Sequence, residues 1–299
     1  MSAAGTASAR LAHVLMWLVP ALWSSNYIIA RLADGVIAPH LLALGRWTLA
    51  ALLMLPFTAR ALVRNGAPWR REWKHMLVLG ALGMWICGAF VYQGGQSTSS
   101  INIALIYAAT PIAIVVASSR LLHERLHAAQ LAGMGLALAG LLFVIAKGDI
   151  AHLLAVRFTT GDLWIVAAAV SWAAYSVLLR LWPSSLGPFE RLVVIVLGGV
   201  VVLLPFTLLE WWVAHRHPFG PQAALLVVLA AVLPGVLSYG AYSFIQRELG
   251  ASRTSLMLYL APVYGAVLAW LVLGEVPGWY HGVGALLILP SIWLATRRG

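Results

Sequence analysis

The sequence has few charged residues and a single cysteine, and each shortage excludes a class of protein. Only 9% of its 299 residues are charged and 62% are hydrophobic, whereas soluble domains have roughly 25% charged and 45–50% apolar residues. Water therefore cannot solvate most of the surface of this chain. The lone cysteine, Cys87, excludes an intramolecular disulfide. There is no G-x-x-x-x-G-K-S/T phosphate loop, so ATP-driven pumping has no support, and we expect no cofactor.

Long apolar runs cover most of the chain instead. Runs of about 18 or more residues with few charges are typical of transmembrane helices. The fold class that we predict is an all-α polytopic membrane protein with ten transmembrane helices. Arg31 and Asp34 follow the first run in place of a small-residue cleavage site, so we expect this run to be retained and not removed as a signal peptide. The predicted spans are Leu11–Arg31, Pro39–Ala59, His75–Gln93, Ser99–Ser119, Ala128–Ala146, Gly161–Leu181, Phe189–Leu209, Gln222–Ile245, Arg253–Leu273 and Gly278–Ala295.

The formal net charge of +10 is spread over short loops and forms no patch on a soluble face. Basic loop residues mark the cytoplasmic side of a membrane protein, and they favour anionic lipid, not nucleic acid, as a partner. With a cytoplasmic N-terminus, 14 Lys and Arg residues lie on the cytoplasmic side and 4 on the far side, with Arg46 left inside a helix. This bias predicts that both termini are cytoplasmic in a multi-pass protein of the cell inner (plasma) membrane.

One stretch of the sequence occurs twice, first at Ala104–Gly133 and again at Ser255–Gly284. Each copy is a long apolar run with a proline inside it, a carboxylate at its end and a glycine in the following run. An internal repeat of this kind constrains the fold before any motif does. The repeated residues are Pro111, Glu124 and Gly133 in the first copy and Pro262, Glu275 and Gly284 in the second.

The repeat extends over both halves of the chain. At an offset of 149 residues Trp23 matches Trp172, Arg31 matches Arg180, and Pro39 matches Pro188. Each half therefore has five spans, and because five is odd the second half enters the membrane inverted. We predict two repeats, residues 1–150 and 151–299, in a 5+5 inverted-topology arrangement. Such repeats are typical of alternating-access carriers with a substrate site near the midplane.

Several of these stretches also resemble a known family. The segments ALWSSNYIIARL and GRWTLAALLMLPF, and the ATP and LAP triplets followed by HER and GEV, are similar to those of the EamA-type drug/metabolite transporters. The resemblance covers about Leu11 to Ala295. It implies ten helices, a central cavity and export of amino acids or other metabolites. Among family members, the chain looks most like the bacterial inner-membrane amino-acid exporters.

Polar and aromatic residues at midplane depth are the candidates for binding a small-molecule substrate. Aromatic rings offer flat apolar contact together with a hydroxyl or N–H group, which suits an amino-acid cargo. Packing, or an interfacial aromatic belt, is the alternative role for any single one of them. The predicted substrate-binding residues are Trp23, Asn26, Tyr27, Arg46, Trp85, Tyr92, Tyr107, Trp172, Tyr175, Tyr239, Tyr242 and Tyr259.

Arg46 and the two repeated prolines each have two interpretations. Arg46 either binds a substrate carboxylate, or snorkels or bonds backbone carbonyls of a neighbouring helix, and the basic residue that family members carry here favours the second. Pro111 and Pro262 are either hinges or kinks that shape the cavity. All nine carboxylates lie at or beyond helix ends, so we expect no proton-carrying carboxylate. The alternatives are facilitated transport down a gradient, or coupling that the sequence does not reveal, and in either case we expect a neutral or zwitterionic solute.

The segment His123–His127 reads HERLH and matches the H-E-x-x-H zinc motif. An intramembrane zinc metalloprotease is therefore one alternative function, and export of other drugs or metabolites is another. The motif lies in a predicted loop and its repeat counterpart keeps only the glutamate, so we expect neither a metal site nor an enzyme. Glycines of the fifth and tenth spans, including Gly140 and Gly284, form faces suited to close helix packing. We expect a monomer, with chain-to-chain pairing through these faces as the alternative.

Overall fold

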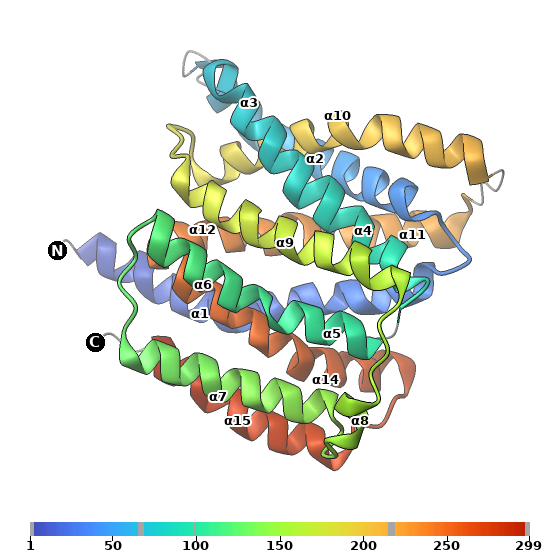
Figure 1. The fold of residues 1–299 in the computed structure, drawn as a ribbon. Coiled ribbons are helices and arrows are strands. Elements are labelled where there is room, and N and C mark those ends of the chain that lie inside the picture. The colour runs from blue at the N-terminus through green and yellow to red at the C-terminus, as the bar shows by residue number, and fades with distance from the viewer. Residues whose placement is uncertain (1–2, 65–68, 99, 215–218, 297–299) are drawn as a thin grey trace.

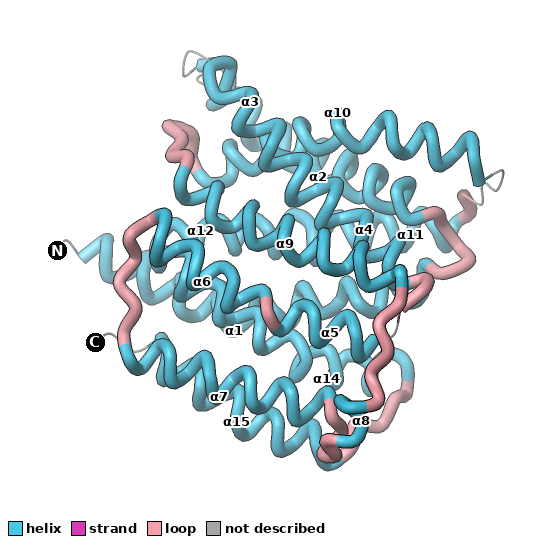
Figure 2. Tube along the Cα trace, viewed as in Figure 1, coloured by secondary structure: helices cyan, strands magenta, loops and turns pink. Residues whose placement is uncertain are grey.

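The computed structural model describes residues 3–64, 69–98, 100–214 and 219–296, and these form helices joined by short loops, with no strand among them (Figure 2). Figure 1 shows a bundle of long helices in which the first turn of α1 and the last described turn of α15 lie on the same side. The elements are α1 (Ala3–Ala33), α2 (Pro39–Arg64), α3 (Trp69–Gly80), the π-helix η1 (Ala81–Ile86), α4 (Cys87–Gly95), α5 (Ser100–Ala108), α6 (Thr110–Leu121), α7 (Ala128–Ile145), α8 (Ala151–Leu154), α9 (Thr160–Leu181), α10 (Pro188–Ala214), α11 (Pro221–Ala230), the π-helix η2 (Ala231–Leu237), α12 (Ser238–Leu249), α13 (Ala251–Ser255), the 3-10 helix η3 (Leu256–Leu260), α14 (Ala261–Leu273) and α15 (Trp279–Thr296).

The prediction of an all-α membrane protein with ten spans is confirmed. Eight helical stretches of the described chain are long and apolar enough to cross a bilayer, and Trp279–Leu294 is a shorter apolar helix. The tenth span is α1, whose 31 residues exceed the required length but include the polar group Ser24–Asn26. Ser99, which begins the fourth predicted span, and three of the basic residues counted for orientation lie outside the described residues: Arg216, Arg297 and Arg298.

Helix ends differ from the predicted boundaries because backbone hydrogen bonding continues past the apolar residues. The first and third spans begin earlier than predicted, at Ala3 and Trp69. The polar stretch Lys147–Gly161 contains the short helix α8, which hydropathy does not reveal. Pro39 and Pro188, matched in the repeat, each take the first position of a helix, where proline leaves no helical hydrogen bond unmade.

The helix pairings recur when the two halves are exchanged. α2 packs on α10, and α7 on α15, so each of these pairs joins equivalent spans. The sixth span (α9) packs on α4 of the third, and the first span (α1) packs on α12 of the eighth, which is the same pairing with the halves reversed. Ser24 Oγ of α1 also donates to the carbonyl oxygen of Ala261 at the start of α14, at 3.0 Å. The first helix of each half thus packs mainly inside the other half.

Two spans in each half depart from the α-helix at matching places. The third and eighth spans contain the π-helices η1 and η2. The fourth breaks at Ala109 between α5 and α6, and the ninth contains η3 before α14. Pro111 and Pro262 lie in the first turns of the helices that follow these breaks. π-Helical turns are rare and often occur at functional sites, so these interruptions indicate the region of a candidate functional site.

The glycine-containing faces of α7 and α15 pack against each other within the same chain. A Cβ atom added to Gly140 of α7 would lie 2.8 Å from Leu287 Cβ of α15, and one added to Gly284 would lie 2.1 Å from Val144 Cγ2. Gly135 and Gly282 have nothing within 4 Å of such an atom. Gly140 and Gly284 therefore allow the close approach of α7 and α15.

Candidate functional site

A cavity of about 940 Å³ lies between the two halves. Its walls come from α1 and α2, from the third, fourth and fifth spans, from α9, and from the eighth, ninth and tenth spans. The cavity reaches one end of the bundle and, within the described residues, takes no lining from the opposite end. Lining residues at the open end are Arg31, Asp34, Pro39, Gln96, Thr98 and His281.

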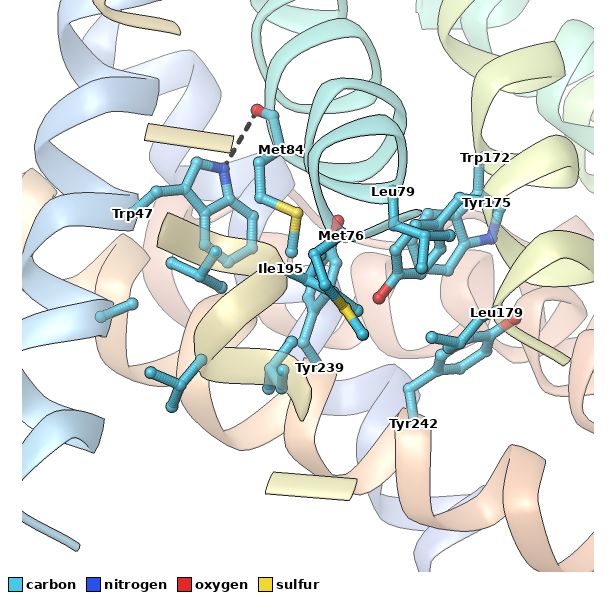
Figure 3. Close-up of a cluster of buried hydrophobic side chains, with 14 of the residues drawn as sticks. Trp47, Met76, Leu79, Met84, Trp172, Tyr175, Leu179, Ile195, Tyr239 and Tyr242 are labelled. Carbon is cyan, nitrogen blue, oxygen red and sulfur yellow. Dashed lines mark hydrogen bonds between the residues drawn. The ribbon is translucent and has the colours of Figure 1, made fainter. Parts of the chain in front are cut away.

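Most of the residues predicted to bind substrate line this cavity, and three do not. The lining members are Trp23, Asn26, Tyr27, Arg46, Tyr92, Tyr107, Trp172, Tyr239 and Tyr259, together with the prolines Pro111 and Pro262. Trp85, Tyr175 and Tyr242 lie behind the cavity wall. The ring of Trp85 stacks on Phe206 of α10 with centroids 3.8 Å apart. Tyr175 stacks on Trp172 with centroids 5.2 Å apart (Figure 3). The Tyr242 hydroxyl donates to Ser176 Oγ at 2.8 Å.

The displacement of Trp85 has a local cause. Trp85 and Tyr92 are seven residues apart and would share a face of an α-helix. Trp85 lies in η1, where hydrogen bonds run from residue i to i+5 and each turn holds more residues. The extra residue per turn rotates Trp85 away from the face that Tyr92 presents. Cys87, directly after η1, faces the cavity in its place, as does Val91 one α-helical turn later.

Cys87 was not among the predicted site residues, although it lines the cavity. Its thiol gave no signal in the sequence because a lone cysteine in an apolar helix is usually a packing residue. The neighbouring Gly88 is a signal in the sequence that could have drawn attention to this position. A Cβ atom on Gly88 would lie 3.2 Å from Trp47 Nε1, so the helix approaches α2 closely here.

Arg46 is the one basic residue found deep in the cavity wall among the described residues, and its side chain is only 3% exposed. Its Nη2 donates to the carbonyl oxygen of Pro234 in η2 at 3.0 Å. Nη1 lies 3.4 Å from both Asn26 Oδ1 and the Tyr92 hydroxyl. The carbonyl contact agrees with one of the two interpretations of Arg46, but the burial shows that the side chain does not snorkel outward.

The floor of the cavity is a group of aromatic rings. Trp23 of α1 meets Trp172 of α9 edge to face, with centroids 5.3 Å apart, and meets Tyr239 of α12 at 5.9 Å. Tyr239 also donates to the carbonyl oxygen of Gly83 at 3.1 Å. Trp47 Nε1 donates to the carbonyl oxygen of Met84 at 3.1 Å (Figure 3). Both acceptor carbonyls belong to the π-helical turn of η1.

The repeated glutamates lie at opposite ends of the bundle in different surroundings. At the end without cavity lining, Glu124 accepts hydrogen bonds from the backbone N–H groups of Ala251 and Ser252, each at 3.0 Å. These bonds join the first half to the start of α13 in the second half. At the open end, Glu275 forms an ion pair with Arg31. Glu124 thus links the two halves at this closed end.

The HERLH segment lies in the loop between α6 and α7, as predicted. His123 has a φ of 53°, so the two histidines do not stand one helical turn apart. In the described part of the chain, no group of three or more His, Cys, Asp or Glu side chains could hold a metal ion. The arrangement gives no support to a zinc metalloprotease.

Comparison with known proteins gives consistent results. The model of the EamA-like transporter family matches residues 10–146 and 159–297. An uncharacterized transporter of Archaeoglobus fulgidus is 24% identical over 96% of this chain and 97% of its own length. A probable terminal-alkyne amino-acid exporter of Streptantibioticus cattleyicolor is 27% identical over 92% and 90% of the two chains. An S-adenosylmethionine/S-adenosylhomocysteine transporter of Chlamydia trachomatis is 22% identical over 93% and 87%.

The fold is shared with a solved crystal structure. It matches with a TM-score of 0.75 and 22% sequence identity, and the match covers 96% of each chain.

Proposed function

Because the chain belongs to the EamA-like transporter family, we propose that it exports amino acids, including aromatic or neutral ones, or related small metabolites by alternating access. The observation that carries this proposal is the cavity of about 940 Å³ between the two halves, open at one end and floored by aromatic rings. Ligand sites are commonly concave pockets of roughly 300–1,000 Å³ with apolar walls and a few polar groups. A solute in this cavity would contact both halves.

The named relatives support an amino-acid cargo without fixing it. One is a probable terminal-alkyne amino-acid exporter, and this similarity supports an amino-acid cargo. Another is named for S-adenosylmethionine and S-adenosylhomocysteine, so export of other metabolites is the second candidate. The aromatic floor favours the first candidate, because ring faces suit an apolar side chain.

The direction and the coupling of transport are also part of the proposal. The open end carries Arg31 and Asp34, on the side that the basic-loop bias assigns to the exterior, so we propose that this state is open outward with both termini cytoplasmic in the plasma membrane. Asp34, at the mouth, is the carboxylate found among the lining residues. A buried proton-carrying carboxylate has no candidate there, which supports facilitated transport. We further propose that the protein acts as a monomer with repeats at 1–150 and 151–299, and that Pro111 and Pro262 act as hinges.

Counterflow in proteoliposomes tests the cargo. Vesicles loaded with unlabelled phenylalanine, leucine or serine should take up the labelled amino acid above empty-vesicle controls, without an imposed proton gradient. A failure with every amino acid of a full panel would refute the cargo, while uptake only in the presence of a proton gradient would refute facilitated transport.

Cys87 provides a second test in the unmodified protein, because it is the single cysteine and lines the cavity. A membrane-impermeant thiol reagent added to the open side should inhibit counterflow, and a transported amino acid should slow the modification. The Cys87→Ala variant is the matched control and should transport without inhibition. Inhibition of that variant would show that the reagent acts elsewhere.

A further inference from the structure

Arg46 is a buried cation without a buried anion opposite it. In the described residues the ion pairs are those of Arg31 with Glu275 and of His40 with Glu210, and neither includes Arg46. A charge removed from water is strongly unfavourable unless it is paired and hydrogen-bonded. Arg46 is 3% exposed, and its Nε has no hydrogen-bond partner. The guanidinium therefore has unused capacity to bind an anion.

The surrounding residues hold the guanidinium in place but do not saturate it. The bond to the carbonyl of Pro234, at 3.0 Å, has ordinary length. The contacts to Asn26 and Tyr92, at 3.4 Å, exceed the usual range of about 2.7–3.2 Å for N–H···O bonds. The ring of Trp47 lies 4.4 Å from the guanidinium carbon and covers one face of the group.

Asn26 adds donors at the same place. Its Oδ1 accepts from the Tyr92 hydroxyl at 2.7 Å, which orients the amide. Its Nδ2 has no acceptor in the described part of the chain. Arg46 and Asn26 both line the cavity, so a bound solute can compete with the long 3.4 Å contacts of Arg46 Nη1 and accept from Asn26 Nδ2. A carboxylate has the planar geometry and the two acceptor oxygens that a guanidinium binds best.

The internal repeat argues against a purely architectural role for Arg46. Its counterpart at the offset of 149 residues is Ile195, which is 1% exposed and belongs to the same apolar core cluster as Met76 and Met84 (Figure 3). The second half thus fills the equivalent position with an apolar side chain. A cation at this position is therefore not a feature that the two halves share.

We propose that Arg46 and Asn26 form a carboxylate subsite that restricts export to solutes bearing a carboxylate. This inference rests on the proposed carrier function and deepens it, because it names the chemical class that the cavity accepts. The carboxylate lies against Arg46, and the apolar part of the solute lies on the ring floor at Trp23 and Trp172. An amine with the same side chain but no carboxylate leaves the guanidinium unpaired and is excluded.

Protection of Cys87 from an impermeant thiol reagent tests this in the intact protein. The probes share one ring: phenylalanine, phenylacetate without the amine, and phenethylamine without the carboxylate. We expect phenylalanine and phenylacetate to protect wild-type Cys87 at concentrations at least about 10-fold lower than phenethylamine does. Phenethylamine has no carboxylate and therefore cannot form the charge-assisted hydrogen bonds with Arg46.

Variants assign the preference to Arg46. R46Q and R46M should weaken protection by phenylacetate about 10- to 100-fold and abolish the preference for the carboxylates, whereas R46K should keep part of it as a point charge. R31Q, which alters the other arginine of the lining at the exposed mouth, should keep the preference. The rate of Cys87 modification without ligand shows whether each variant is folded. If R46Q and R46M misfold, the R46K variant and the three probes on the wild type test the carboxylate subsite.

The outcomes separate this inference from the proposed function. Equal protection of the wild type by phenethylamine, no protection by either carboxylate, or an unchanged preference in a folded R46Q protein would overturn the subsite. Counterflow of an amine or another solute without a carboxylate would overturn it too, and would leave the carrier intact. A lack of counterflow with every solute would instead contradict the carrier.

Discussion

The two repeated glutamates should exchange their surroundings when the carrier changes state. Glu124 caps Ala251 and Ser252 at the closed end, while Glu275 pairs with Arg31 at the open end. The repeat relates Arg31 to Arg180 and the capped residues to Ser100 and Ile101. In the opposite state we therefore expect Glu124 to pair with Arg180, and Glu275 to accept from the backbone N–H groups of Ser100 and Ile101.

The bonds made by Glu124 set the size of the effect. Each of its two 3.0 Å bonds to a backbone N–H group involves an ionised acceptor and contributes about 1.5–3 kcal/mol. Glutamine keeps one acceptor oxygen and loses the charge, so we expect Glu124→Gln to weaken the closed end by about 1.5 kcal/mol, or about tenfold in the ratio of the two states. The Arg31–Glu275 pair is 60% and 49% exposed, so its loss changes this state by no more than about 1 kcal/mol.

Reactivity of Cys87 from the open side measures the ratio of the states. If the present state is about 90% populated, a tenfold shift reduces it to about half, and the modification rate falls by about the same factor. Glu275→Gln removes the cap in the opposite state, so the rate should stay the same or rise. A fall of equal size in both variants, or no change in Glu124→Gln, would refute the exchange.

Three further perturbations test the packing and the site assignment. Gly140→Ala should lower the free energy of unfolding by about 1–3 kcal/mol through overpacking against α15, seen as a lower Tm in detergent, whereas Gly135→Ala has open space and should not. Trp85→Ala should lower the Tm by removing the stack on α10 but leave the protection of Cys87 by ligand unchanged, and a loss of protection would place Trp85 in the site. His123→Ala and His127→Ala should leave counterflow intact, and purified wild-type protein should contain no stoichiometric zinc by elemental analysis.

The fold was largely predictable, because hydropathy and the internal repeat depend on properties that the bilayer imposes. Apolar length identified the spans, and the pairing of α2 with α10 and of α7 with α15 agrees with two equivalent halves. Pro111 and Pro262 lie directly after interruptions of the fourth and ninth spans, and their role as hinges or kinks stays a prediction. The residues that end each helix were less predictable, because polar side chains can continue a helix beyond the apolar run.

The site was less predictable than the fold, because lining depends on the rotation of each helix. The π-helical turn of η1 moves Trp85 out of the cavity wall and leaves Cys87 in it, and no hydropathy pattern encodes that turn. Tyr175 and Tyr242 have the depth expected of site residues, but they face the core behind Trp172. The capping contact of Glu124 joins residues 127 positions apart in the chain, so sequence alone could not reveal it.

The packing of α1 has a consequence for biosynthesis. Its main neighbours are α12, α14 and η2 of the second half, so α1 is synthesised well before the helices on which it packs. Until the ninth span is inserted, the hydroxyl of Ser24 lacks its bond to the carbonyl oxygen of Ala261. Synthesis of the first half alone should therefore leave α1 unpacked and exposed to membrane quality control, and supplying the second half as a separate chain should rescue it.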